Sequence, residues 1–247
     1  MWLSALTDKG RVRENNQDAF EAKKLDSFAY LIVCDGMGGE NGGQVASRIA
    51  VEVAKKQLEN GFGGRVTENE ARRILSCAVT NANISVFDES TKYPDLHGMG
   101  TTMTIAVIKD GLVHVANVGD SRAYLIRDGV LTQLTEDHTF VRELVANGTL
   151  TYEEAKNHPR RHMITRAIGA EENVSPDIFS LEINEDDSLL LCSDGLYNSL
   201  EENEMEEIIA IAIRKKDVSP MIALANERGG GDNITAALIS LTRGGAN

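Results

Sequence analysis

Five aspartates stand where the sequence predicts strand ends or tight turns. They are Asp18, Asp35, Asp120, Asp194 and Asp232, and most of them lie beside a glycine. Hard divalent cations bind short carboxylates together with backbone carbonyls, which a neighbouring glycine leaves accessible. A single Asp-Gly pair is typical of an ordinary turn or helix cap. Five aspartates at the ends of apolar segments predict instead a metal site in which bound ions carry the chemistry.

Other common catalytic chemistries fail on spacing. A cysteine-dependent phosphatase requires an arginine six residues after its cysteine, and the sequence has Glu40, Asn83 and Asn198 at those positions. The sequence contains no Gly-x-x-x-x-Gly-Lys phosphate loop and no His-Glu-x-x-His zinc motif. Cys34 and Cys192 lie in predicted strands, so we expect them in the core and not on a zinc ion.

The elements that must position the aspartates are predicted from the spacing of apolar residues. Runs rich in Val, Ile, Leu and Thr predict strands at 28–34, 101–108, 112–118, 121–127, 187–193 and 233–241. Helical spacing recurs near 45–53, 74–86, 201–214 and 219–227. Turn sequences at 109–111 and 127–129 predict an antiparallel meander over 101–135. Antiparallel strands between pairs of helices indicate the α+β fold class, with sheets covered by helices.

Composition and charge limit the partners and the location. The chain has 247 residues, 42% hydrophobic and 26% charged, and we expect a single domain over 1–243 with a disordered tail at 244–247. A net charge of −13 disfavours binding to nucleic acid. Apolar runs fall far short of the ~18 residues that span a bilayer, and the N-terminus lacks a secretory pattern. We therefore expect no membrane span and a cytoplasmic protein.

Eight motifs, in order along the chain, resemble those of one enzyme family. They are TDKGRVRENNQD, DGMGGENGG, GMGTT, VGDSRAYLIRDG, LTEDHTFVRELVANG, HPRRHMITRAIG, LLCSDGLYNSL and GGGDNITAAL. Together they span about residues 4–241 and closely resemble the metal-dependent type 2C protein Ser/Thr phosphatases of the compact bacterial kind. The resemblance implies a four-layer αββα sandwich, in which two antiparallel sheets are flanked by helix pairs, around a centre of two Mn²⁺ or Mg²⁺ ions.

The resemblance also assigns ligands to these ions. Asp35 would bridge both metals, and the Gly36 carbonyl would bind one of them. Asp194 and Asp232 would complete the other metal. Asp120 would form a third, weaker site with Asp194.

The same resemblance implies a mechanism and partners. A water that bridges the metals would attack phosphorus, Asp18 would hold metal-bound waters, and Arg13 would bind the substrate phosphate through its planar guanidinium. The substrates would be phosphoserine and phosphothreonine on proteins modified by a cognate bacterial Ser/Thr kinase, and the enzyme would be a monomer. A catalytically silent scaffold and a phosphatase of small metabolites are the alternatives.

Departures from the family pattern leave the general acid open. Gln17 stands where many members carry Glu, and Met37 and Glu40 stand where many carry His. We expect a metal-bound water to supply the proton to the leaving group, with His138 and His162 as the alternative donors.

The segment 137–166 resembles the mobile flap beside the cleft in bacterial members. Within it, Arg160 and Arg161 add positive charge to an acidic protein, and we expect them to contact acidic phosphopeptides.

Overall fold

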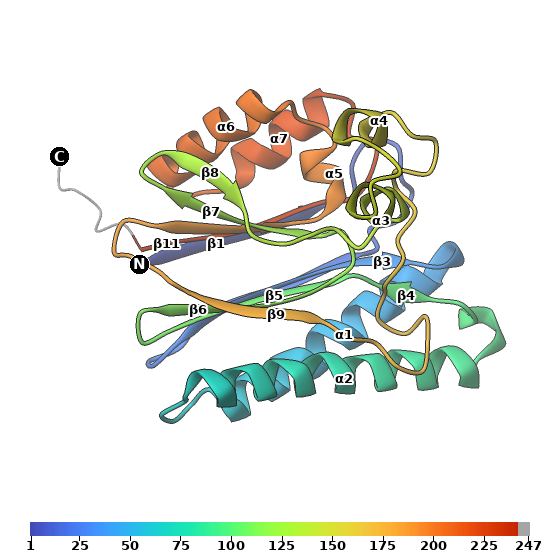
Figure 1. Ribbon diagram of the computed structural model, residues 1–247, viewed down its shortest axis with the longest axis horizontal. Coiled ribbons are helices and arrows are strands. Elements are labelled where there is room, and N and C mark those ends of the chain that lie inside the picture. The colour runs from blue at the N-terminus through green and yellow to red at the C-terminus, as the bar shows by residue number, and fades with distance from the viewer. Residues whose placement is uncertain (242–247) are drawn as a thin grey trace.

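Two antiparallel β-sheets lie face to face in the computed structural model, which describes residues 1–241 apart from the side chains of Glu40 and Glu202 (Figure 1). The tail predicted at 244–247 lies outside the described residues. Helices cover the outer face of each sheet, so the layers run helix, sheet, sheet, helix. The α+β sandwich implied by the family resemblance is confirmed.

One sheet has the strand order β1-β11-β10-β7-β8. Its strands are β1 (Trp2–Asp8), β11 (Ile234–Ser240), β10 (Ser188–Cys192), β7 (Arg122–Arg127) and β8 (Val130–Gln133). Helices α6 (Glu202–Lys215) and α7 (Ser219–Glu227) pack on its outer face. The short helix α5 (Asp194–Tyr197) follows β10 directly.

The other sheet has the order β2-β3-β5-β6-β9, and β4 pairs with the end of β3. Its strands are β2 (Asp18–Lys24), β3 (Ala29–Met37), β4 (Gly100–Thr101), β5 (Met103–Lys109), β6 (Leu112–Val118) and β9 (Asp177–Glu182). The long helices α1 (Gly39–Gly61) and α2 (Glu68–Lys92) cover it, and the 3₁₀ turn η1 (Pro94–Leu96) follows α2. A capping box between Thr67 and Glu70 starts α2, because each side chain satisfies a free backbone N–H.

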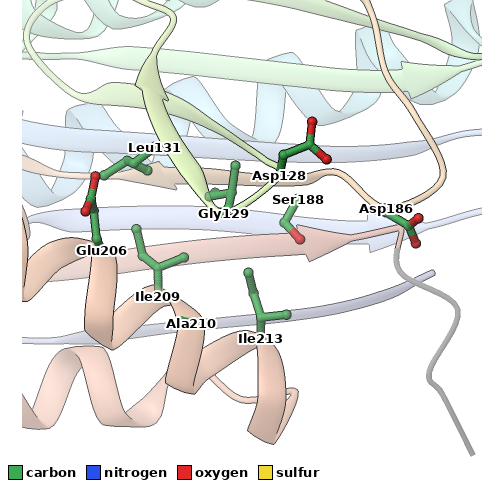
Figure 2. A pocket seen from close by; sticks show the side chains of 10 residues that line it. Asp128, Gly129, Leu131, Asp186, Ser188, Glu206, Ile209, Ala210 and Ile213 are labelled. Carbon is green, nitrogen blue, oxygen red and sulfur yellow. The ribbon is translucent and has the colours of Figure 1, made fainter.

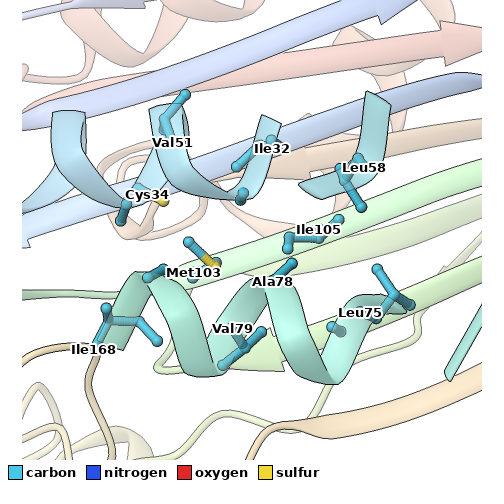
Figure 3. Close-up of a cluster of buried hydrophobic side chains, with 14 of the residues drawn as sticks. Ile32, Cys34, Val51, Leu58, Leu75, Ala78, Val79, Met103, Ile105 and Ile168 are labelled. Atoms are coloured by element: carbon cyan, nitrogen blue, oxygen red, sulfur yellow. The ribbon is translucent and has the colours of Figure 1, made fainter. Parts of the chain in front are cut away.

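Alternation along β3 explains why the strand is apolar throughout. Tyr30, Ile32 and Cys34 face α1 and α2, whereas Ala29, Leu31 and Val33 face the opposite sheet. Successive side chains of a strand point to opposite faces, and both faces are covered here. Figure 3 shows the helix side of this core, where Ile32 and Cys34 lie near Val51, Met103 and other apolar side chains of α1, α2 and β5.

The meander predicted over 101–135 is wrong as a single sheet. β5 and β6 form a hairpin in one sheet, and β7 and β8 form a hairpin in the other. The free edge of β6 pairs with β9, so β7 cannot lie beside it. Gly119 turns the chain between the sheets with φ +101°, and a Cβ there would lie 2.6 Å from the Thr102 side chain.

Three strands were not predicted: β1, β2 and β9. All three are edge strands of the two sheets, and most of their residues are only partly buried or exposed. An edge strand with one partner keeps polar and charged side chains, so its apolar signal is weak.

The segment 137–166 lies at the end of the sandwich where α5 begins (Figure 1). It contains α3 (Phe140–Ala146) and α4 (Tyr152–Lys156), and Val141 of α3 is buried. Among the described residues, no helix is both long and apolar enough to cross a bilayer.

Candidate metal centre

The two sheets bring the five aspartates together at one end of the strands. Asp18 and Asp35 are direct neighbours across β2 and β3. Asp194 is the first residue of α5 and lies two residues after the end of β10, and Asp232 lies two residues before the start of β11. β10 and β11 are antiparallel neighbours, so the end of one and the start of the other lie at the same edge. Asp120 lies in the turn that passes from β6 to β7.

The electrostatics of the cluster follow from this gathering. Burial raises the pKa of Asp35 well above its usual 3.8, and the negative charges of the other four aspartates raise it further. Burial also raises the pKa of Asp18 to about 7 and the pKa of Asp120 to about 7, with a further contribution from the charge of Asp194 in each case. The pKa of Asp194 is likewise raised by burial and then by Asp232. The carboxylates therefore repel one another until positive charge compensates them.

Asp18 is held by one oxygen only. Its Oδ2 accepts hydrogen bonds from the Ser193 hydroxyl at 2.7 Å and the Thr235 hydroxyl at 2.6 Å. The Asp18 side chain is almost fully buried, and its Oδ1 has no hydrogen-bond partner. A buried carboxylate oxygen without a partner is costly, and it suits a site completed by a cation and its waters.

The backbone of Asp35 is fixed by the Gly-Thr-Thr motif. The Asp35 N–H donates to the Thr102 hydroxyl at 2.8 Å, and the Asp35 carbonyl accepts from Thr102 N–H and from the Thr101 hydroxyl. Thr102 also bonds to the hydroxyl of Ser121, next to Asp120. These bonds join the β3 end of the site to the β6–β7 turn.

Gly36 is a position where only glycine fits. A Cβ there would lie 2.0 Å from the Gly43 carbonyl oxygen in the first turns of α1. The backbone of the first turns of α1 therefore packs directly against the backbone that follows Asp35, with no room for a side chain between them.

Arg13 lies beside Asp232. Its Nη2 donates to Asp232 Oδ2 at 2.7 Å, and the Arg13 side chain is 54% exposed. The second carboxylate oxygen of Asp232 accepts from the backbone N–H of Asn233. A guanidinium carries five N–H donors, so this ion pair leaves the fork able to bind an anion at the open side.

The residues fit hard divalent cations. Within residues 1–241, no three His, Cys, Asp or Glu side chains meet as a preformed metal-binding group. Mutual repulsion among the carboxylates opposes such convergence in the absence of cations. The donors are nonetheless oxygens of short carboxylates, with one buried oxygen unpartnered, and these are the ligands that Mn²⁺ and Mg²⁺ prefer.

The two histidines weighed as proton donors differ in their surroundings. His138 is buried, its Nδ1 accepts the Gly119 N–H at 3.1 Å, and its Nε2 therefore carries the proton and donates to Asp177 at 3.1 Å. Burial lowers the pKa of His138. Both ring nitrogens are used by the fold, so His138 is unavailable as a proton donor to substrate. His162 is half-exposed, and its Nδ1 lies 4.0 Å from Asp194 Oδ2.

The remaining departures have their own contacts. The Gln17 amide donates to the Gly39 carbonyl at 2.9 Å, which ties β2 to the start of α1. Met37 lies at the end of β3 opposite Gly100. Sequence reasoning missed three supporting residues. Ser193 and Asn233 are polar residues next to the predicted ligands Asp194 and Asp232, whereas Thr235 lies inside a predicted strand, three residues after Asp232.

A groove of about 240 Å³ between the β7–β8 hairpin and α6 lies elsewhere (Figure 2). Its floor includes Leu131, Ile209 and Ile213, and Asp128 and Asp186 stand at its rim. Asp120 precedes β7 and Asp128 follows it. The groove therefore lies at the opposite end of the strands from the aspartate cluster.

Comparison with known proteins points to one family. Residues 8–238 match the family model described as protein phosphatase 2C. The chain is 42% identical over 239 residues to the serine/threonine phosphatase stp of Listeria monocytogenes, covering 94% of this chain and 93% of that protein.

Solved structures agree in fold. The crystal structure of the Mycobacterium tuberculosis serine/threonine phosphatase PstP/Ppp has a TM-score of 0.86 and 36% identity, covering 98% of both chains. A structure of the catalytic domain of the serine/threonine protein phosphatase PstP in complex with two manganese ions has a TM-score of 0.80 and 35% identity, covering 96% of both chains.

Proposed function

The chain belongs to the protein phosphatase 2C family, and from that membership we propose that its five aspartates form the metal centre of a serine/threonine protein phosphatase. The activity class is that of its relatives: it is a metal-dependent phosphoprotein hydrolase. The observation that carries the assignment to these residues is the buried, unpartnered Oδ1 of Asp18 inside a cluster of carboxylates with raised pKa values.

Each aspartate has a proposed role. Asp35 would be a ligand of two ions, the Gly36 carbonyl would bind one of them, and Asp194 and Asp232 would hold the other. Asp18 would hold waters bound to the ions, because two hydroxyl donors occupy its Oδ2 and its buried Oδ1 has no protein partner.

Asp120 is the proposed ligand of a third, weaker ion, shared with Asp194. Burial raises the pKa of Asp120, and the negative charge of Asp194 raises it further, so the two carboxylates interact. The Asp120 carbonyl accepts from the Tyr197 hydroxyl at 3.0 Å, which holds the turn against α5.

The chain positions the substrate around this centre. When bound, the cations supply an acidified water as nucleophile and positive charge beside the phosphoryl oxygens. Arg13 binds the phosphate with two N–H groups of its guanidinium. Its ion pair with Asp232 keeps the guanidinium beside the metal centre. No covalent phosphoenzyme is needed, so no nucleophilic side chain is required.

The proposed substrates are proteins phosphorylated on serine or threonine by a cognate Ser/Thr kinase. We infer that the enzyme acts as a cytoplasmic monomer and uses Mn²⁺ or Mg²⁺. The net charge of −13 repels a negatively charged phosphoprotein at long range. We therefore expect the substrate to be recognised by local contacts at the cation-loaded cleft.

The test is a panel of phosphothreonine peptides and small phosphorylated metabolites assayed with Mn²⁺, with Mg²⁺ and with excess EDTA. We expect peptide hydrolysis that requires the cation and is lost in EDTA. Asp35→Asn should lower turnover by more than about tenfold, because it removes metal-borne stabilisation of the transition state and each ~1.4 kcal/mol is tenfold in rate. Activity that persists in EDTA would refute the metal centre, and faster hydrolysis of a metabolite than of every peptide would refute the substrate class.

A further inference from the structure

The side chain of Asn233 makes three hydrogen bonds, all to the backbone of one segment. Its Nδ2 donates to the Lys9 carbonyl and to the Asn15 carbonyl, each at 2.9 Å, and its Oδ1 accepts the Gln17 N–H at 2.8 Å. An amide has two N–H donors, and both are used here. Asn233 is buried, at 5% exposure, so water does not replace these partners readily.

The segment that Asn233 binds is the connection 9–17 between β1 and β2, which carries Arg13. The three bonds reach both the start and the end of this connection. Its middle is held to the same part of the chain, because Arg11 N–H and Val12 N–H donate to the Gly230 carbonyl. The Arg13 side chain is more than half exposed, so few packing contacts fix its position. The position of Arg13 therefore depends on how firmly the backbone of the 9–17 connection is held.

Asn233 also fixes the partner of Arg13. Its own backbone N–H donates to Asp232 Oδ1 at 2.8 Å, while Asp232 Oδ2 accepts from Arg13 at 2.7 Å. One residue thus orients the carboxylate through its backbone and the loop of the arginine through its side chain.

We propose that Asn233 is a positioning residue for substrate binding: its amide holds the 9–17 connection so that the Arg13 guanidinium meets the phosphate at the metal centre. This inference rests on the proposed function for the role of Arg13. The hydrogen-bond clamp itself does not, and it can be tested in the metal-free chain.

The chain contains a matched control at Asn83. This buried asparagine donates to the carbonyls of Glu171 and Glu172 and accepts the Gly169 N–H, which are also three bonds from one amide to one segment. That segment carries none of the residues assigned to the metal centre or to phosphate binding. Asn233→Ala and Asn83→Ala therefore remove the same chemistry from different places, and Asn233→Ser is the milder variant if Asn233→Ala does not fold.

The first measurement is hydrogen exchange by mass spectrometry on the metal-free proteins. We expect exchange in residues 9–17 to be faster by about tenfold or more in the Asn233 variant, with the rest of the sheet unchanged. Asn83→Ala should leave 9–17 unchanged and speed exchange in residues 169–172. Unchanged exchange of 9–17 in the Asn233 variant would overturn the clamp whether or not the chain is a phosphatase.

The second measurement uses inorganic phosphate as the probe, with the Mn²⁺-loaded enzymes and a phosphothreonine peptide as substrate. We expect the inhibition constant of phosphate to rise about tenfold in the Asn233 variant and to stay within twofold of wild type in Asn83→Ala. In an Arg13→Ala background, the Asn233 substitution should have less than a twofold effect, because the two residues act through one contact. Additive losses in that cycle would show that Asn233 supports the fold and does not position Arg13.

Discussion

Replacing Asp18 by asparagine should remove most of the loss of stability that the metal-free protein undergoes as the pH rises. The folded chain raises the pKa of Asp18 from 3.8 to about 7, chiefly by burial. Between pH 3.8 and about pH 7, Asp18 therefore keeps its proton in the folded state and loses it in the unfolded state. The stability associated with that proton is complete below about pH 4 and is lost as the pH rises through 7.

The magnitude follows from the shift. About three pKa units at ~1.4 kcal/mol each amount to about 4 kcal/mol, and between pH 5 and pH 8 about two of those units, or about 3 kcal/mol, are lost. An asparagine has nearly the same shape and does not ionise, and its carbonyl oxygen can still accept from Ser193 and Thr235. For a chain of this length, about 3 kcal/mol corresponds to roughly 6–12 °C in Tm.

The assay is chemical denaturation of the EDTA-treated proteins at pH 5 and pH 8, followed by circular dichroism. We expect the free energy of unfolding of wild type to fall with pH much more steeply than that of Asp18→Asn. Asp26→Asn, in the exposed turn between β2 and β3, is the control and should follow wild type. Saturating Mn²⁺ should raise the free energy of unfolding of wild type more than that of Asp18→Asn, because the intact carboxylate helps to bind the ions. Parallel pH dependences of wild type and Asp18→Asn would refute the reasoning.

Three further outcomes are expected at the cleft. Asp120→Ala should fold normally, lose turnover and bind one Mn²⁺ ion fewer by calorimetry; an unchanged number of ions would remove Asp120 from the metal centre. Charge reversal at Arg160 and Arg161 should weaken turnover of acidic phosphopeptides several-fold while sparing p-nitrophenyl phosphate. The Arg160 Cζ lies 5.3 Å from the centre of the Phe140 ring, so replacing Arg160 also removes a packing contact, and Arg161→Glu alone is the cleaner variant. Equal losses on both substrates would mean that these arginines support the site. His162→Gln should cost less than about tenfold on a phosphopeptide if a water supplies the leaving-group proton. A larger loss on the phosphopeptide only, together with loss of the acidic-side pH dependence, would identify His162 as the acid.

The family and the candidate ligands could be derived from the sequence because they depend on local patterns. Asp35 and Asp194 each follow a run of buried apolar strand residues and precede glycine, and this local pattern can be recognised without knowing which strands are neighbours. The helices α6 and α7 were likewise predicted within one or two residues, since an apolar face at helical spacing is encoded in neighbouring positions.

Pairing between distant strands was decided by tertiary structure. The β6–β7 connection was predicted as part of one meander, but the edge of β6 is taken by β9, about 60 residues later, whose own sequence signal is weak. The same holds for the support of the site. Ser193, Thr235 and Asn233 serve Asp18 and Arg13 only because β10 and β11 bring positions more than 170 residues apart into hydrogen-bond contact. Spacing along the chain cannot encode such contacts, because they arise when the two sheets close on a common core.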